Sequence, residues 1–536
     1  MNILLIKKIM NKKIAYSLLL LSILLFHIVI NYQILVRSSI PKIYDEAGRI
    51  YYGIVYFQRF FLNAHPNITD LVKEASSLSQ GQCHPHLFDF LEAASFKILY
   101  LFNNVDIDSM VIIVNSFFLL ILLISVYKIG SIIYDRNTGL LSAFLLSLFP
   151  LVFGHSRIAM LDYPLMCMVS LSVHLLLETK LFHSLFYSIL AGIVFGLSQL
   201  TKETAILFIL PFLIYYFIKA YLLGDKKKVI SNFIFTVLFF IAISGIVYLR
   251  KDNLYAFKTY FAKIYYIRNQ AESFYYVKNF INMIGPFILF LSLPLVLSYV
   301  VNIKKREKLL FVWFFVPLIL FSLSFNKSPR FLLPILPVFA LIIAGEIKLG
   351  GWFKPLRWKY GFILVLLALL QYALLNCGFL VLEKNSIIME KGLLSAKKES
   401  KYALVDTELL GILKEEARKN KYKMKAVVYL FNIAEIHWPI RLNALLCELP
   451  YMFFCYTELD EADIANMHYS ETYWREKVLS ADYIINKSGD RGIPYFVSHI
   501  GDIQNKTFEE NKGLFEMITQ LKIPDGSAVY VYKKVK

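Results

Sequence analysis

The sequence has few charged residues and many apolar ones. Of its 536 residues, 18% are charged and 57% are hydrophobic, and the mean hydropathy is +0.56. A soluble protein of this length could not bury so many apolar side chains, so a soluble class is excluded. Phe and Tyr are abundant, with 45 and 35 residues, and aromatic side chains concentrate at lipid–water interfaces. The composition therefore predicts a multi-pass membrane protein.

Acidic residues are also in the minority, with 39 Asp and Glu against 57 Lys and Arg and a net charge of +18. A basic excess of this size is also typical of proteins that bind nucleic acid. Here many basic residues fall in short segments between apolar runs, as in cytoplasmic loops of membrane proteins. The expected partner is therefore the lipid bilayer and not nucleic acid.

Cysteine is scarce, and the five cysteines match no metal-ligand spacing. Cys447 and Cys455 fall in the same predicted soluble segment, where two interpretations remain open. They form a disulfide if that segment faces an oxidising space, or they are two buried thiols. The sequence also lacks an internal repeat and a low-complexity linker.

Eleven apolar runs are candidates for membrane-spanning helices. Lysines precede the first run, which predicts a cytoplasmic N-terminus. This run is interpreted as a retained anchor, because it is long for a signal peptide and no small-residue cleavage site follows it. An odd number of spans places the C-terminus outside. The predicted spans are 14–33, 109–127, 138–154, 163–178, 184–200, 204–220, 231–249, 280–301, 309–325, 331–346 and 361–382.

The spans divide the chain into a transmembrane domain, residues 1–382 with a first outer loop over 34–108, and an extracytoplasmic domain, residues 383–536. The loop stretch HLFDFLEAASFKILYLF has apolar residues at helical spacing and predicts an amphipathic helix. In the tail, KAVVYLF, ADYIINK and AVYVYKK predict strands, and DTELLGILKEEARKNK predicts a helix. The predicted fold class is a polytopic α-helical membrane protein with a small C-terminal α/β domain.

Charged residues beside the apolar runs gather on the predicted outer face. A charge at the bilayer centre costs about 2.5–3.5 kcal/mol, so such residues lie at the membrane edge or have a function. The stretches and their charged residues are YDEAGRIYYG with Asp45 and Glu46, HSRIAMLDYPL with Arg157 and Asp162, TKETAILFILPF with Lys202, and SPRFLLPILP with Arg330.

Carboxylates and cations at a membrane edge suit the transfer of a sugar from a lipid phosphate to an acceptor hydroxyl. A carboxylate can act as general base on the hydroxyl, while Lys and Arg stabilise the departing phosphate. Because phosphate leaves as a stable anion, one carboxylate suffices where a glycosidase needs two. Direct attack by the acceptor would invert the anomeric centre.

Each charged residue also has a structural interpretation, which the sequence leaves open. The structural roles are solvation in a loop for Asp45 and Glu46, an N-cap for Asp162, and interface anchoring for Lys202 and Arg330.

In their order and spacing, these motifs resemble the GT-C glycosyltransferases, specifically the branch of protein O-mannosyltransferases and lipid A aminoarabinose transferases. The resemblance covers roughly residues 40 to 382. CHPHLF keeps the family's His-Pro at His84, although His86 stands where a second Pro is common. The other matching features are the Asp-Glu of the first outer loop, the third-helix start in DRNTGLLSAFLLSLFP, Arg157 with Asp162 and Pro164, Lys202 after the fifth span, and Arg330 before a proline-broken helix.

The resemblance implies an inverting glycosyltransferase of the GT-C type in the plasma (inner) membrane. Its donor would be a polyprenyl-phosphate-linked monosaccharide, and its acceptor a protein, a glycolipid or a polysaccharide on the outer face. It implies no metal site, and it is compatible with a divalent cation without requiring one. The implied roles are catalytic base for Asp45, shaping of the site for Glu46 and Asp162, donor-phosphate contact for Lys202, Arg330 and Arg157, and a loop position in the site for His84.

Three other functions remain open. A transferase or ligase could use a lipid-linked oligosaccharide instead of a monosaccharide. A lipid or solute transporter is expected to show paired halves and mid-membrane charges, and the sequence shows neither. A non-catalytic scaffold or sensor would not need charged residues from separate segments to converge.

Overall fold

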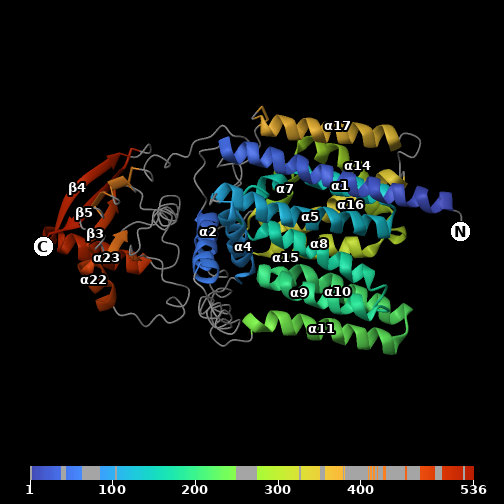
Figure 1. The fold of residues 1–536 in the computed structure, drawn as a ribbon, viewed down its shortest axis with the longest axis horizontal. Helices are drawn as coiled ribbons and strands as arrows, with labels where there is room; N and C mark the ends of the chain where they lie inside the picture. The colour runs from blue at the N-terminus through green and yellow to red at the C-terminus, as the bar shows by residue number, and fades with distance from the viewer. Residues whose placement is uncertain are drawn as a thin grey trace.

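A computed structural model of the protein shows a helical bundle with a small β-sheet beyond one of its ends (Figure 1). The first helix, α1 (Ile3–Arg37), starts at the opposite end of the bundle. The structure describes residues 3–37, 44–62, 85–102, 106–248, 274–324, 327–349, 357–377, 379–380, parts of 408–419, 426–429, 453–455, 471–488, 498–522 and 526–535.

The eleven predicted spans each coincide with a helix or a broken pair of helices, and the polytopic helical fold class is confirmed. Six described helices are long and apolar enough to cross a membrane, and one bent pair gives a seventh. The count of eleven stays a prediction. After α1, the bundle comprises α5 (Ile107–Ile133), α6 (Arg136–Ser147), α7 (Pro150–His155), α8 (Asp162–Glu178), α9 (Leu185–Thr201), α10 (Ala205–Leu223), α11 (Lys226–Tyr248), α13 (Tyr275–Ile284), α14 (Pro286–Val301), α15 (Lys308–Leu323), α16 (Leu336–Leu349) and α17 (Arg357–Asn376).

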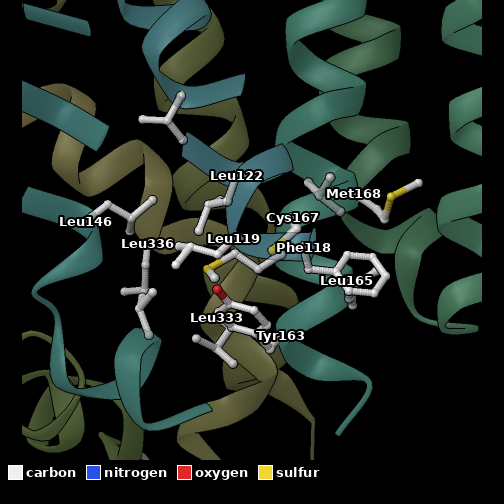
Figure 2. Packing of buried hydrophobic residues seen from close by; sticks show 14 of the residues in the cluster. Phe118, Leu119, Leu122, Leu146, Tyr163, Leu165, Cys167, Met168, Leu333 and Leu336 are labelled. Carbon is white, nitrogen blue, oxygen red and sulfur yellow. The ribbon is translucent and has the colours of Figure 1, made fainter. Parts of the chain in front are cut away.

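The centre of the bundle is an apolar contact between α5, α6, α8 and the segment that leads into α16. Phe118 and Leu122 of α5, Tyr163 of α8 and Leu336 of α16 lie together there (Figure 2). These side chains are all almost fully buried. Close packing of this kind fixes where the ends of these helices lie, and therefore where the charged residues at their ends lie.

The predicted span 280–301 is not one straight helix. It is broken at Gly285 into α13 and α14, which are bent by 115°. Gly285 has a φ of +88°, a conformation that favours glycine, and Pro286 cannot continue the helical hydrogen bonds. The side chain of Gln371 in α17 forms hydrogen bonds with the backbone on both sides of the break. Its Oε1 accepts from Phe287 N at 2.9 Å, and its Nε2 donates to Ile284 O at 3.0 Å.

Two further predicted spans contain proline breaks. The span 138–154 is divided into α6 and α7 just before Pro150, which occupies the first turn of α7. The span 331–346 begins as a 3-10 helix, η3 (Pro329–Ile335), and continues as α16. Proline lacks the N–H that a continuous α-helix needs, which explains both breaks. The proline-broken helix predicted after Arg330 is confirmed.

Three helical segments of the first predicted outer loop lie across the bundle end that faces the sheet (Figure 1). They are α2 (Tyr44–Tyr56), the π-helical turn η1 (Phe57–Leu62) and α4 (Leu87–Leu101). The helix predicted for this loop is confirmed as α4, although its exposed face is not simply polar. Its buried face includes Phe88, Ala93 and Phe96 at helical spacing, while Phe90 and Ile98 are exposed.

The C-terminal region contains a five-stranded sheet in the order β2-β1-β3-β5-β4. β1 is parallel to β2 and β3, and β5 is antiparallel to β3 and β4. The three predicted strands are confirmed as β1, β3 and β5, whereas β2 and β4 were not predicted. The strands are β1 (Ala426–Tyr429), β2 (Phe453–Cys455), β3 (Tyr483–Lys487), β4 (Phe515–Lys522) and β5 (Ala528–Lys534).

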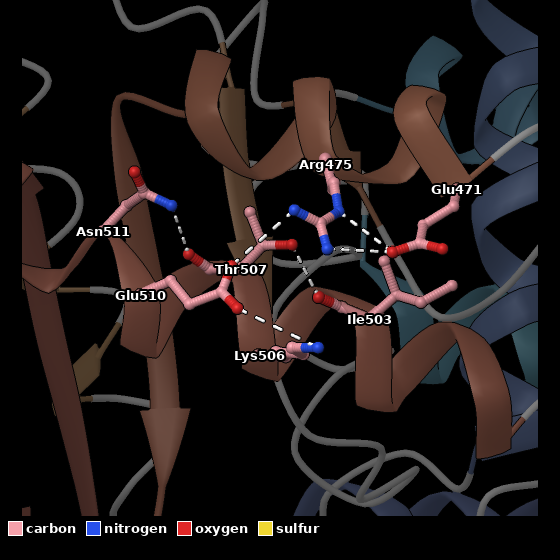
Figure 3. A network of polar contacts seen from close by, with 7 residues as sticks. All are labelled: Glu471, Arg475, Ile503, Lys506, Thr507, Glu510 and Asn511. Atoms are coloured by element: carbon pink, nitrogen blue, oxygen red, sulfur yellow. Dashed lines mark hydrogen bonds and ion pairs between the residues drawn. The ribbon is translucent and has the colours of Figure 1, made fainter.

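Two helices, α22 (Glu471–Ser480) and α23 (Ser498–Glu510), accompany the sheet. Arg475 of α22 lies 2.9 Å from Glu471 Oε1 and 3.6 Å from Glu510 Oε2 of α23, which links the two helices (Figure 3). The described residues of the helix predicted over 406–421 are helical. The pairing of Cys447 with Cys455 concerns side chains outside the described residues.

Candidate active site

Three charged residues from separate segments meet at the bundle end crossed by α2 and α4. Asp162 begins α8, Lys202 follows the last residue of α9, and Arg330 lies in η3. Lys202 Nζ donates to Asp162 Oδ1 at 2.7 Å, and Arg330 Nε lies 3.9 Å from Asp162 Oδ2. The structure thus brings together three of the predicted site residues, and we call them the charge cluster.

The structure speaks against one of the two interpretations of Asp162, and the functional one stays a prediction. Leu161 occupies the N-cap position of α8, and no side chain caps this helix, so the N-cap interpretation is wrong. The Asp162 carboxylate instead faces Lys202, and the N-terminal end of the helix macrodipole also favours a negative charge at this position. Lys202 is 8% exposed, and its ammonium is paired with Asp162 inside the protein.

Phe331 supports both cations of the cluster, and sequence reasoning missed it. Its ring centroid lies 5.3 Å from Lys202 Nζ and 5.4 Å from Arg330 Cζ. Contact with an aromatic face stabilises a cation, so one ring helps two like charges to lie near each other. The sequence signal was the aromatic residue directly after Arg330 in SPRFLLP.

Within the charge cluster, two cations lie beside one carboxylate. Buried charges are screened less by solvent than exposed ones, and their fields are correspondingly stronger. Lys and Arg donate strong charge-assisted hydrogen bonds to phosphate oxygens. The arrangement therefore suits an anionic group of low charge that approaches from the end of the bundle.

Arg157 lies apart from these contacts. Its side chain is fully buried, and it donates from Nε to Asn31 Oδ1 at 2.9 Å and from Nη2 to Asn376 Oδ1 at 2.6 Å. Asn31 belongs to α1 and Asn376 to α17, so Arg157 joins the first and last helices of the bundle. Its predicted contact with the donor phosphate stays a prediction.

Glu46 links α2 to the turn that precedes Asp162. Its side chain is buried, and Oε1 accepts from the backbone N of Ala159 at 3.1 Å. Asp45 lies in the first turn of α2, but its side chain is outside the description. The structure thus places the Asp45 backbone on the helix that Glu46 attaches to the charge-cluster side of the bundle.

A second polar group lies between α2 and α4. Asp89 of α4 accepts from Arg49 Nη1 of α2 at 3.2 Å, and His86 Nδ1 lies 2.5 Å from the same Asp89 oxygen. Glu92 follows one turn later, and both of its oxygens are buried without a hydrogen-bond partner among the described residues. A Cβ on Gly53 of α2 would lie 2.7 Å from Glu92 Oε2, so glycine permits this close approach.

The two carboxyls of α4, which lies outside the predicted spans, differ in protonation. Burial raises the pKa of Asp89, but Arg49 and His86 outweigh burial and hold this pKa below its ordinary value. Burial raises the pKa of Glu92 well above its ordinary value, and the Asp89 carboxylate raises it further. Asp89 is therefore the more acidic of the two carboxyls, and Glu92 holds its proton to a higher pH. The sequence signal was acidic residues on the apolar face of HLFDFLE.

His84, the predicted loop position, lies outside the described residues. Among the residues that are described, no group of three or more His, Cys, Asp or Glu side chains could hold a metal ion. The charge cluster itself offers only one carboxylate, already paired with Lys202, and two cations would repel a metal ion.

The family of dolichyl-phosphate-mannose-protein mannosyltransferases has a sequence model that matches residues 83–248. This range includes Asp162 and Lys202 but neither Asp45 nor Arg330. No curated protein sequence matches the chain.

Solved structures resemble the chain over nearly its whole length. ArnT from Cupriavidus metallidurans, bound to undecaprenyl phosphate, superposes with a TM-score of 0.60 at 11% identity, covering 96% of this chain and 98% of ArnT. The oligosaccharyltransferase AglB from Archaeoglobus fulgidus, in complex with an inhibitory peptide and a dolichol-phosphate, has a TM-score of 0.52 at 12% identity. This match covers 95% of this chain and 74% of AglB. The arabinofuranosyltransferase AftD from Mycobacteria has a TM-score of 0.53 at 10% identity, covering 96% of this chain and 40% of AftD.

These similarities agree with the helical bundle, the loop helices at one end and the C-terminal sheet described above. At 10–12% identity they establish the fold and not the substrates. The resemblance predicted from the sequence motifs is confirmed: the chain is an integral membrane protein with the fold of the GT-C glycosyltransferases.

Proposed function

We propose that the protein transfers a monosaccharide from a polyprenyl-phosphate donor to an acceptor hydroxyl, with inversion at the anomeric carbon, on the outer face of the plasma membrane. The observation that carries this proposal is the charge cluster, in which Lys202 and Arg330 lie beside Asp162 at the end of an apolar bundle. The lipid tail of the donor would stay in the bilayer, and its phosphate would meet the two cations.

The fold supports a lipid phosphate as the class of ligand. ArnT has the same fold and was solved bound to undecaprenyl phosphate, and AglB was solved with a dolichol-phosphate. Since these relatives are only distantly similar, the ligand class is transferred here as a proposal. The charged residues of this chain supply the independent support, because Lys and Arg donors stabilise the charge that develops on a departing phosphate.

In the proposed reaction, the Asp45 carboxylate accepts the proton of the acceptor hydroxyl as its oxygen attacks the anomeric carbon. The bond between that carbon and the phosphate oxygen breaks, and polyprenyl phosphate leaves with the bonding electrons. Lys202 and Arg330 stabilise the leaving phosphate. Glu46 holds the start of α2 at Ala159, so that Asp45 lies near the reacting centre.

The test is transfer of radiolabelled sugar from polyprenyl-phosphate donors, supplied one sugar at a time, to native membrane extract. Purified wild-type protein is compared with Asp45→Asn, which keeps the shape of the side chain and removes the base. We expect one donor to label a product with the wild type and a loss of about 100-fold or more with the variant. Asp108→Asn, at the start of α5, is the matched control and keeps activity.

Three results would contradict parts of this proposal. Consumption of a lipid-linked oligosaccharide in place of every monosaccharide donor would show that the donor is larger. No donor consumption by folded protein would favour transport. Full activity of Asp45→Asn would show that another group is the base.

A further inference from the structure

The contact between α2 and α4 is built around one buried carboxylate that the proposed chemistry does not use. Asp89 is fully buried, and one of its oxygens, Oδ2, receives both Arg49 Nη1 and His86 Nδ1. His86 is 92% buried, since its side-chain exposure is 8%. A buried carboxylate is stable only when it is paired and hydrogen-bonded. These two contacts therefore allow Asp89 to be ionised between α2 and α4. We call this contact between the two helices the joint.

The joint is coupled to the candidate active site through α2. Arg49 lies three residues after Glu46 and four after Asp45, so the three residues share one face of the helix. Glu46 holds the beginning of the same helix at Ala159 N. The helix is thus attached at two points, and a change at Arg49 would rotate or shift the turn that carries Asp45.

Close packing makes the joint sensitive to small changes. Gly53 of α2 leaves no space for even a Cβ beside Glu92 of α4. The ring of His86 also lies against α2, with centroid distances of 5.4 Å to Tyr52 and 5.5 Å to Tyr56. Tightly packed elements move as units and do not deform locally, so the orientation of α2 follows the contacts of α4.

We propose that His86, Asp89 and Arg49 form a positioning unit that fixes α2, and with it Asp45, against the turn before Asp162. This inference rests on the proposed transferase function. His86 acts through its Nδ1–H donor to Asp89 and not as a base at Nε2. It is this chain's own arrangement, because His86 departs from the proline that the family resemblance leads one to expect.

The two nitrogens of His86 can be tested separately. In His86→Asn the amide NH2 takes the place of Nδ1 and can still donate to Asp89, while nothing replaces Nε2. In His86→Gln the amide reaches the place of Nε2, and the contact with Asp89 is lost. A positioning role requires the first variant to work and the second to fail.

The first readout is sugar transfer from the polyprenyl-phosphate donor that the wild type uses. We expect His86→Gln to lower kcat by about 10- to 100-fold, the effect of a misplacement of about 1 Å. The donor KM should stay within about threefold, because Lys202 and Arg330 are unchanged. We expect His86→Asn to keep kcat within about threefold and to keep the pH profile of the wild type.

The second readout does not depend on activity. Glu46 protects the Ala159 amide by a hydrogen bond, so hydrogen exchange of the peptide that contains Ala159 reports where α2 lies. We expect faster exchange in His86→Gln and wild-type exchange in His86→Asn. If the wild type transfers no sugar while this exchange pattern holds, the proposed function fails and the positioning unit stands.

Two results would overturn the proposal. Loss of kcat in His86→Asn would show that the Nδ1 contact with Asp89 does not suffice, and wild-type kcat with wild-type exchange in His86→Gln would show that the joint fixes nothing. If His86→Gln does not fold, Arg49→Lys carries the test, since it keeps the charge but changes the reach from α2 to Asp89; full activity there would overturn the proposal. Ile98→Val is the matched control on α4, because the Ile98 side chain is exposed.

Discussion

At the scale of single residues, Asp162 has a role that its sequence position alone does not suggest. It compensates Lys202 at 2.7 Å and lies 3.9 Å from Arg330. A phosphate that bound these cations would compete with the Asp162 carboxylate for the same donors. In the proposed function, Asp162 would be a counter-ion that stabilises the buried Lys202 and the partly buried Arg330 when no phosphate is bound, at a cost in phosphate affinity.

We expect Asp162→Asn to bind polyprenyl phosphate about tenfold more tightly. Tenfold corresponds to about 1.4 kcal/mol, close to the lower end of the range for a hydrogen bond to a charged group. Turnover should fall, because the lipid phosphate product would leave more slowly. Binding of polyprenyl phosphate to the purified protein, measured by calorimetry in detergent, checks the affinity.

Glu307→Gln provides the comparison, because Glu307 is also paired with a lysine, Lys219, at 3.0 Å. This pair joins α10 and α15 away from the charge cluster, so phosphate affinity should not change. Weaker phosphate binding in Asp162→Asn would contradict the counter-ion role and would show that Asp162 mainly holds Lys202 in place.

The residues of the charge cluster could be predicted because charges are conspicuous between apolar runs. The side chains that contact each charged residue could not be predicted from the sequence. Phe331 contacts Lys202 from a segment more than a hundred residues away, and Arg157 meets amides from α1 and α17. His86 and Asp89 form a pair within one helical turn, but only the third contact, from Arg49 on α2, makes that pair a joint between helices.

At the scale of elements, apolar length predicted where helices lie but not where they bend. Apolar length and periodicity are local properties of the chain: apolar length predicted the eleven spans, and periodicity predicted α4. The break at Gly285 depends on Gln371, whose contact with Phe287 spans 84 positions. A bend of 115° in the bundle is stable only because that side chain supplies a donor and an acceptor to the interrupted backbone.

Gly285→Ala should destabilise the bundle by about 3 kcal/mol or more. The positive φ of Gly285 is strained by about 1–2 kcal/mol for other residues, and a Cβ would lie 2.0 Å from the Gln371 amide. Displacing Gln371 would also leave two buried backbone groups without partners, at about 1–3 kcal/mol each. A lower unfolding temperature in detergent, followed by tryptophan fluorescence, checks this expectation.

The matched substitution is Gly361→Ala in α17. There the nearest atom to the new Cβ is the Ile347 side chain at 3.2 Å, and alanine favours a helix by up to about 1 kcal/mol. This variant should stay within about 1 kcal/mol of the wild type. Equal effects of the two substitutions would argue against a special role for the break at Gly285.

At the scale of the whole molecule, the C-terminal sheet is held to a separate stretch of chain by one carboxylate. Glu416 Oε2 accepts from Lys533 Nζ of β5 at 2.8 Å and from Tyr483 Oη of β3 at 2.9 Å. Lys419 Nζ donates to the other oxygen at 3.0 Å. Glu416 thus contacts Tyr483 of β3 and its paired residue Lys533 of β5, which joins residues far apart in sequence.

This network makes the stability of the C-terminal domain depend on acid pH. Burial raises the pKa of Glu416, but hydrogen bonds from Lys533, Lys419 and Tyr483 outweigh burial and lower the pKa to about 2. A carboxyl whose pKa is lower in the folded state stabilises the fold above its unfolded pKa, about 4.3. That contribution is lost as the pH falls through the folded pKa.

Glu416→Gln should therefore lower the unfolding temperature of the C-terminal domain at pH 7, and the difference from wild type should shrink between about pH 4.3 and pH 2. Protease resistance of the domain in the full-length protein, measured with an acid-active protease after heating at each pH, gives the unfolding temperature. Glu471→Gln is the control, because Glu471 and Arg475 form an exposed pair that contributes little. A difference that stayed constant down to pH 2 would show that Glu416 stabilises the sheet by packing and not by its charge.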